Sequence, residues 1–281
     1  MYHVYQSVSL IFIYTALVVM ETISRKPSKR ERVEKNKTAA DQLREVMERE
    51  DSVHKIVIDC SFGHIMTDFE RTSLAVQIQQ CYSHLRKHVG KTVMQAVSVD
   101  PELDQRIRKQ GGNEWIMQST SKALEELIES FRNENRNIIV MSPDAEREFS
   151  ADDLSSSNSV FVIGGIVDRL VSRNETAHKA IKLGLEARRL PTDGDRFKNK
   201  VFNIDSVFDF LLRCFDLMES PTRDQLVDIL CTVLPERKKK DRTEMQQPDP
   251  KTLMPVKLQN ADINPCNTIK LERYNVLELF Q

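Results

Sequence analysis

The residues with the clearest chemical potential lie in the segment VFVIGGIVDR, where Gly164 and Gly165 interrupt a β-rich run and Asp168 follows it. Glycines inside a strand usually mark a bend or a site where a ligand comes close to the backbone. A carboxylate directly after an apolar strand end is placed to accept a proton or to orient a ligand. The alternative is a β-bulge followed by a helix-capping aspartate.

Two basic clusters follow this segment. Arg188 and Arg189 precede a Leu-Pro turn, where paired guanidiniums suit phosphate or carboxylate groups. Surface arginines on a short strand are the alternative. A further basic run, 237–240, comes after a helix-like stretch, where cations also suit the helix dipole.

Several enzyme classes lack support in this sequence. GxGxxG, the P-loop pattern, HExxH and GxSxG are all absent, which disfavours nicotinamide- and ATP-dependent enzymes. The five cysteines are widely spaced and form no CxxC pair, so neither a zinc site nor a disulfide framework is indicated. We expect core thiols in a reducing compartment.

The elements that must position these residues alternate between strand-like and helix-like segments. Such alternation predicts βαβ units, hence an α/β fold with a mainly parallel sheet, whose ligands bind at the carboxyl ends of strands. Strands are expected at 55–60, 92–99, 137–142, 159–167 and 200–204. Helices are expected after the Thr67–Glu70 capping box, at 101–110, 121–131 and 176–187, after Asp205 as a cap, and after the Thr222–Gln225 box.

Four zones are predicted along the chain: 1–20, 21–52, 53–240 and 241–281. The apolar run 8–20 is too short for a confident membrane span and lacks basic flanks, and Met20 is the favoured working start. The charged zone 21–52 is expected to be a partly helical or disordered arm that does not pack. The zone 53–240 carries the core, and 241–281 is expected to be mostly irregular.

The overall charge is balanced, with 41 basic and 42 acidic residues, but the stretch 21–40 holds seven basic residues against three acidic ones. This local excess indicates an arm that could contact phosphates, or a solvated tail.

Taken in order, KIVIDCSF, QIQQCY, IVMSPDAE, VFVIGGIVDR, LEARRLP and VLPERK resemble the SPOUT-class tRNA methyltransferases that act on N1 of the purine at position 9. The resemblance covers about residues 55–240. It implies a parallel α/β core with a deep C-terminal trefoil knot, S-adenosylmethionine as cofactor, tRNA as substrate and a monomeric enzyme, with guanine as the most similar target. No membrane partner is expected. The implied location is the nucleus or cytoplasm, with the mitochondrion as the alternative.

By this resemblance, Asp168 is the general base. The implied cofactor contacts are Met141, Gly165, Arg169, Leu170, Val171, Ser172, Arg173, Thr176, Leu190, Lys200, Val201 and Phe202. Family members often have Asn where this chain has Leu170. That departure leaves a second hypothesis open, a non-catalytic tRNA-binding subunit on the same fold.

Guanine N1 carries a proton that must leave as the new bond forms, whereas adenine N1 has an available lone pair. Asp168 is therefore a base if guanine is methylated, and an orienting group if adenine is. Charge and placement indicate the tRNA-binding candidates, which are Lys26, Lys29, Arg30, Arg32, Arg86, Lys87, Lys91, Lys238 and Lys239.

Overall fold

The computed structural model describes residues 28–49, 53–88, 90, 92–155, 159–167, 174–192, 195–197, 200–217 and 219–236. Asp168 through Arg173, Lys26, Lys91, Lys238 and Lys239 lie outside these ranges, as do the 1–20 and 241–281 zones. Predictions that concern them remain predictions.

A six-stranded parallel sheet forms the centre of the described fold, in the order β3-β2-β1-β5-β4-β6. The strands are β1 (His54–Asp59), β2 (Thr92–Val97), β3 (Gln118–Ser119), β4 (Ile138–Met141), β5 (Val160–Gly164) and β6 (Glu186–Arg188). β2 and β4 are buried along their length, as are all but one residue of β1 and of β5, as expected for parallel strands covered on both faces. The predicted parallel α/β architecture is confirmed.

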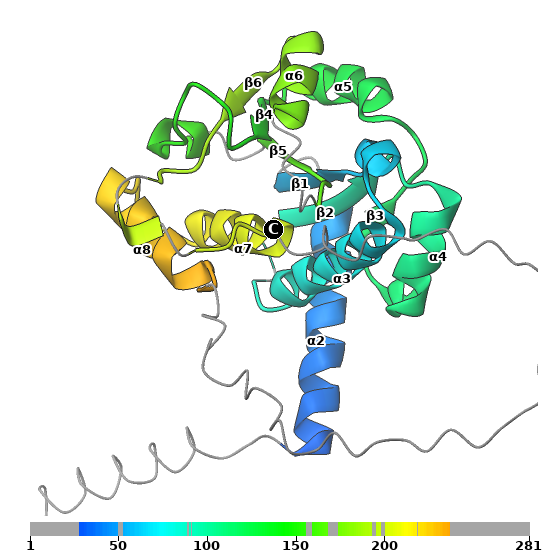
Figure 1. Cartoon of the computed structure of the whole chain (residues 1–281). Helices are drawn as coiled ribbons and strands as arrows, with labels where there is room; N and C mark the ends of the chain where they lie inside the picture. The colour runs from blue at the N-terminus through cyan, green and yellow to red at the C-terminus, as the bar shows by residue number, and fades with distance from the viewer. Residues whose placement is uncertain are drawn as a thin grey trace, which may run out of the picture. The chain divides into compact units, whose positions relative to one another are not determined.

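Helices cover both faces of this sheet (Figure 1). One face packs against α5 (Leu124–Asn133) and α6 (Glu175–Lys182), through a smaller cluster that includes Val57, Val162 and Ala180. The other face holds the larger core. Its helices are α3 (Asp68–Leu85), α4 (Pro101–Lys109), α7 (Ile204–Phe215) and α8 (Arg223–Val233).

Local signals set most helix boundaries. Both predicted capping boxes, Thr67 with Glu70 and Thr222 with Gln225, are present, and each begins a helix. Asp100 caps α4, whose first residue is proline, and Gly111 adopts a left-handed backbone just after that helix ends. Short 3-10 turns occupy Ser61–Ile65, Gly112–Glu114, Ala151–Leu154 and Asp195–Phe197.

The predicted helix over 176–187 is wrong at its C-terminal end. α6 ends at Lys182, because Gly184 takes a left-handed conformation (φ +62°) and Leu185 donates its N–H to the carbonyl of Ala180. These bonds form a Schellman motif, which stops a helix. The chain then enters β6, the strand that carries Arg188.

The predictions for 200–205 also need correction. Residues 201–203 form no strand; Lys200 makes an isolated bridge to Glu236, and Val201 donates to the carbonyl of Pro235. α7 begins after Asn203 rather than after Asp205, which lies inside the helix. The side chain of Gln77 on α3 accepts the N–H of Ile204 at 2.9 Å, so a distant helix supplies the cap.

The charged zone packs more closely than the sequence suggested. α2 (Lys29–Glu48) is helical, and Ala39, Leu43 and Val46 in its second half are buried. These three residues lie one turn apart on one side of the helix, so they bury a common stripe. The expectation of an unpacked arm is therefore wrong for this half, although the first turns of α2 are exposed.

Three cysteines confirm the expectation of core thiols: Cys60, Cys81 and Cys214 are buried and free, while Cys231 is partly buried. None of the helices within the described ranges has the length and apolar character needed to cross a bilayer. Over the same ranges, no group of three or more His, Cys, Asp or Glu residues is arranged to hold a metal ion.

Candidate active site at the strand ends

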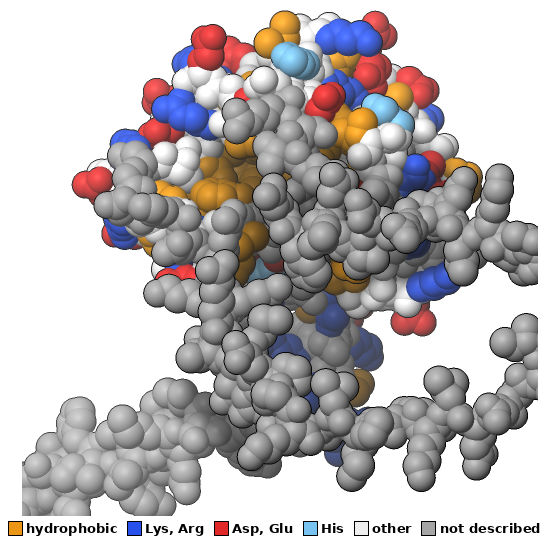
Figure 2. Space-filling model, viewed as in Figure 1, with side chains coloured by type: hydrophobic (Ala, Val, Ile, Leu, Met, Phe, Trp, Pro, Cys, Tyr) orange, Lys and Arg blue, Asp and Glu red, His pale blue; other side chains and the backbone are white. Residues whose placement is uncertain are grey.

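A cavity of about 800 Å³ opens at the carboxyl ends of β4, β5 and β6. Sites for small ligands typically span about 300–1,000 Å³, so this cavity is large enough for a cofactor. It lies where the sequence predicted a ligand site, after the glycine-bearing strand β5. Figure 2 shows hydrophobic side chains gathered on the viewed face of the molecule.

Six parts of the fold build the cavity wall: the segments after each of β4, β5 and β6, the start of α6, one side of α3, and the stretch that leads into α7. The lining residues are Ser73, Gln77, Met141, Ser142, Pro143, Asp144, Ile163, Gly164, Ile166, Val167, Glu175, Thr176, Arg189, Leu190, Thr192, Lys200, Val201, Phe202, Asn203, Ile204 and Val207.

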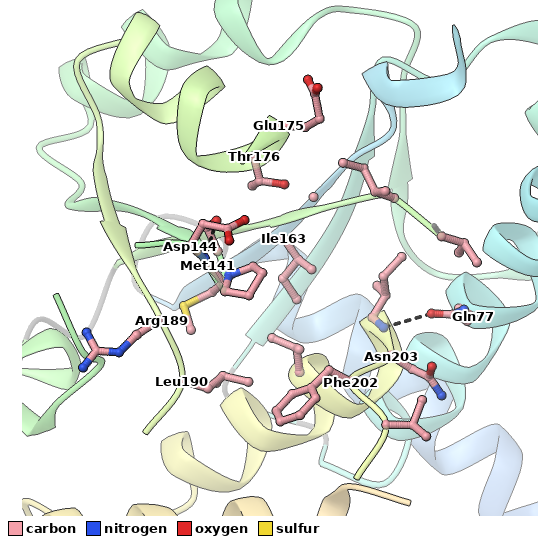
Figure 3. Close-up of a pocket in the computed structure, with 18 of the residues that line it drawn as sticks. Gln77, Met141, Asp144, Ile163, Glu175, Thr176, Arg189, Leu190, Phe202 and Asn203 are labelled. Carbon is pink, nitrogen blue, oxygen red and sulfur yellow. Dashed lines mark hydrogen bonds between the residues drawn. The ribbon is translucent and has the colours of Figure 1, made fainter. Parts of the chain in front are cut away.

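The cavity differs in character from one end to the other (Figure 3). Asp144 and Thr176 lie toward one end, with Glu175 beyond them and its carboxylate turned away, and Leu190 and Phe202 lie at the other end. Asp144 is held in place because its Oδ2 accepts the N–H of Asn174 at 2.9 Å. A ligand with a cationic end and an apolar or aromatic end matches this arrangement.

Six of the residues that the resemblance assigned to the cofactor line this cavity. They are Met141, Thr176, Leu190, Lys200, Val201 and Phe202. Gly165 is not among the lining residues, although its neighbours Gly164 and Ile166 are. Asp168 directly follows Val167, the last described residue of this wall.

The two glycines are explained by close packing. A Cβ atom on Gly164 would lie 2.5 Å from Oγ1 of Thr176, and one on Gly165 would lie 2.8 Å from the carbonyl oxygen of Asp59. A larger residue at either position would force these neighbouring atoms to shift. The glycines therefore bring β5 close to both α6 and the end of β1.

Arg188 and Arg189, adjacent in sequence, lie in different environments. Arg188 is buried on β6, with its Nε 2.9 Å from Oδ1 of Asp153 and a second bond to Glu186. Burial alone would lower the pKa of Arg188, but the bonds and charges of Glu186 and Asp153 raise it. Arg189 lines the cavity, and its guanidinium reaches the backbone of Glu146.

The sequence reasoning missed the contribution of α3 to this cavity. QIQQCY carried the resemblance, but no role followed for Gln77, and none was assigned to Ser73, Asp144 or Glu175. Asp144 could have been found, because it follows a predicted strand. The position of α3 beside the start of α7 depends on tertiary packing that no local signal encodes.

Of the described tRNA-binding candidates, Lys29, Arg30, Arg32 and Lys87 are exposed and Arg86 is half-buried. Lys29, Arg30 and Arg32 share the first turn of α2, while Arg86 and Lys87 follow the end of α3. None of the five lines the cavity.

Comparison with known proteins identifies the family. The model of the tRNA (guanine(9)-N(1))-methyltransferase TRM10/TRM10A family matches residues 20–239. A tRNA (guanine(9)-N1)-methyltransferase from Schizosaccharomyces pombe is 27% identical over 56% of this chain and 52% of its own length. Human tRNA methyltransferase 10 homolog A is 28% identical over 68% of this chain and 54% of its own. The chain thus spans about half the length of these curated relatives.

Solved structures agree on the fold. The spTrm10(74) crystal structure superposes with a TM-score of 0.55 at 24% identity, over 66% of this chain and 95% of that one. The full-length spTrm10 complex with SAH gives a TM-score of 0.54 at 24% identity, over 66% and 96% of the two chains. Because the family model matches most of the sequence, this chain belongs to the tRNA (guanine(9)-N(1))-methyltransferase TRM10/TRM10A family.

Proposed function

We propose that this protein methylates N1 of guanine at position 9 of tRNA, with S-adenosylmethionine as methyl donor. The observation that carries the proposal is the cavity at the ends of β4, β5 and β6, which gathers six of the residues expected to bind the cofactor. Some relatives, such as the one from Schizosaccharomyces pombe, are named tRNA (guanine(9)-N1)-methyltransferases, and one similar structure contains SAH.

The cavity fits the cofactor in size and polarity. Leu190, Val201 and Phe202 would hold its adenine ring by apolar contact, and Asp144 at the opposite end would attract its cationic groups. When bound, S-adenosylmethionine supplies an electrophilic methyl group on a sulfonium centre. The chain itself has to orient the target base and accept its proton.

Asp168 is the residue proposed to accept that proton. Val167, its neighbour, is anchored because its N–H approaches Sδ of Met66 at 3.4 Å, and it lines the cavity. The carboxylate of Asp168 would take the proton from N1 of guanine as N1 bonds to the methyl carbon and the carbon–sulfur bond breaks, which removes the positive charge that would otherwise build up on the base. Adenine would need only orientation.

We also propose that the chain is knotted and acts as a monomer. The knot is supported by the route after β6: the chain runs past the cavity and then forms α7, on the face of the sheet opposite α6. A knotted crossing would bring the segments after β4, β5 and β6 into one pocket. Light scattering of the purified protein tests the monomer.

The experiment that tests the function is mass spectrometry of unmodified tRNA incubated with the protein and S-adenosylmethionine. We expect N1-methylguanine at position 9. If no tRNA gains a methyl group although it binds the protein, the chain is instead a non-catalytic tRNA-binding subunit.

A second arm tests Asp168. With a tRNA carrying guanine at position 9, Asp168→Asn should lower the methylation rate by about 10²–10⁴-fold. The decrease in rate that the wild-type protein should show at low pH should be absent from the variant. Calorimetry should show unchanged cofactor binding. An Asp168→Asn protein that methylates guanine at the wild-type rate at every pH would rule out the base assignment while leaving the transferase function intact.

A further inference from the structure

A buried ion pair lies behind the cavity wall, outside the residues that line the cavity. It joins Asp59, the last residue of β1, to Lys179 on α6, with 2.7 Å between Oδ2 and Nζ. Their side chains are only 2% and 15% exposed. Two charges removed from water in this way must be well partnered, and they hold their two elements in one relative position.

The Lys179 ammonium has three oxygen neighbours. Besides Asp59, Nζ lies 2.9 Å from Oγ of Ser61 and 3.3 Å from Oε1 of Glu125. The other oxygen of Asp59 accepts from the Ser61 N–H and from the Ser98 hydroxyl, both at 3.2 Å. Lys179 is therefore engaged by oxygen atoms within the protein, and little of its side chain is accessible to a tRNA phosphate.

The same network continues into the glycine turn of the cavity. Gly165 donates its N–H to the carbonyl of Asp59 at 2.8 Å. Thr176, which packs against Gly164, lies three residues before Lys179 and so shares its side of α6. One side of α6 thus contacts the end of β5 through Thr176 and the end of β1 through Lys179.

We propose that Lys179 is a positioning residue for the cofactor site. Through Asp59 it holds the start of α6 against the Gly164–Gly165 turn, and so fixes Glu175 and Thr176 in the cavity wall. It does this without touching the ligand. This inference rests on the proposed function, because the ligand in question is S-adenosylmethionine.

Calorimetric titration of the full chain with S-adenosylmethionine tests the idea. The double variant Asp59→Asn/Lys179→Met removes both charges, so neither is left buried alone. We expect it to unfold cooperatively but to bind the cofactor at least about tenfold more weakly, since small misplacements of positioning groups have large effects. Lys179→Arg, which keeps the cation, should recover part of this loss.

Arg136→Met is the matched control. Arg136 is also a buried cation, hydrogen-bonded to Glu134 and to the carbonyl of Val53, but it lies at the opposite end of the strands. This variant should lose stability and keep the wild-type affinity. Equal weakening of cofactor binding in Arg136→Met would show that affinity follows global stability, and would overturn the inference.

Two further outcomes separate the inference from the proposed function. If the wild-type chain binds the cofactor and the double variant binds it equally well, the positioning role is wrong and the function stands. If the wild-type chain binds no S-adenosylmethionine, the proposed function fails and the inference fails with it.

Discussion

At the scale of single residues, the glycine turn shows how one sequence feature can carry two explanations. The sequence allowed a ligand contact or a bulge at Gly164 and Gly165. The structure adds a third cause, because a side chain at either position would collide with Thr176 or with the backbone of Asp59. Thr176 also lines the cavity, so the residue that packs against Gly164 is one that a ligand in the cavity could contact.

This contact predicts the effect of Gly164→Ala. The added methyl group would lie 2.5 Å from Oγ1 and 3.2 Å from Cγ2 of Thr176. We expect a loss of about 1–3 kcal/mol in the free energy of unfolding, as for other overpacked sites, together with weaker cofactor binding. Urea denaturation and calorimetry measure the two effects.

The double variant Gly164→Ala/Thr176→Ala is the control for that prediction, because it removes both clashing atoms. Most of the stability should return, while cofactor affinity should stay reduced if Thr176 itself contacts the ligand. An equal loss of stability in the single and double variants would contradict the steric explanation. Gly165→Ala has no such rescue, because its clash is with backbone.

At the scale of helices and strands, the sequence predicted what depends on neighbouring residues. The boxes Thr67–Glu70 and Thr222–Gln225 begin α3 and α8 because each is complete within four residues. The end of α6 was predicted wrongly, although Gly184, a typical helix stop, is a local signal for it. The start of α7 could not be predicted, because its cap comes from Gln77, more than a hundred residues earlier.

The residues of the candidate site likewise differ in whether the sequence could identify them. The ligand site after β5 could be predicted, because the carboxyl ends of parallel strands are the usual ligand sites. Met141 at the end of β4 and Leu190 after β6 were instead implied by the family resemblance. Ser73 and Gln77 could not be predicted, because their place in the cavity depends on how α3 packs against α7. Asp168 was identified from its sequence context alone, and its role remains a prediction.

The interface between α3 and α7 contains a buried carboxylate whose ionisation should stabilise the fold. Asp209 is paired with His84 at 3.2 Å and with Arg213 at 3.1 Å, and His88 lies 3.6 Å away. Burial opposes ionisation of Asp209, but the hydrogen bonds and charges of His84 and Arg213 outweigh it and lower the pKa. Because the folded pKa lies below the unfolded one, this contribution is present above about pH 4 and is lost as the pH falls further.

Asp209→Asn should therefore lower the free energy of unfolding by about 1–3 kcal/mol at neutral pH. The gap between wild type and variant should shrink as the pH falls below the unfolded pKa of about 4. Urea denaturation at several pH values measures it. A gap that is constant from neutral pH to pH 3 would argue against the charged pair. Asp216→Asn, at a carboxylate 43% exposed on the same interface, is a control expected to change little.

α2 offers a test of where the folded domain begins. Leu43 is 2% exposed and belongs to the main core, whereas Val33 on the same helix is 58% exposed. Leu43→Ala should cost about 2–5 kcal/mol and Val33→Ala less than about 0.5 kcal/mol. Both values come from denaturant unfolding. If Leu43→Ala were as mild as Val33→Ala, α2 would not be part of the cooperative unit.

At the scale of the whole molecule, the basic residues fall into two groups, one buried in the fold and one exposed on its surface. Lys179, Arg136 and Arg188 are used inside the fold, in networks that leave them little access to a ligand. The first turn of α2 instead exposes Lys29, Arg30 and Arg32. Net charge therefore says nothing about tRNA binding here, whereas the location of each cation does.

This division predicts how tRNA affinity should depend on salt. A protein cation that neutralises a phosphate releases a counterion, so each contact adds about 0.7–0.9 to the steepness with which affinity falls on a log–log salt plot. If Arg30 and Arg32 both contact phosphates, Arg30→Gln/Arg32→Gln should weaken binding to all tRNAs and reduce that slope by about 1.4–1.8.

The matched control is Lys109→Gln/Lys122→Gln, which removes two exposed charges from α4 and the segment before α5. Equal slopes for the two double variants would mean that α2 contributes only general positive charge. A lower slope in the α2 variant alone, with its cofactor affinity unchanged, would assign these arginines to the tRNA-binding surface, separate from the cavity that holds the methyl donor.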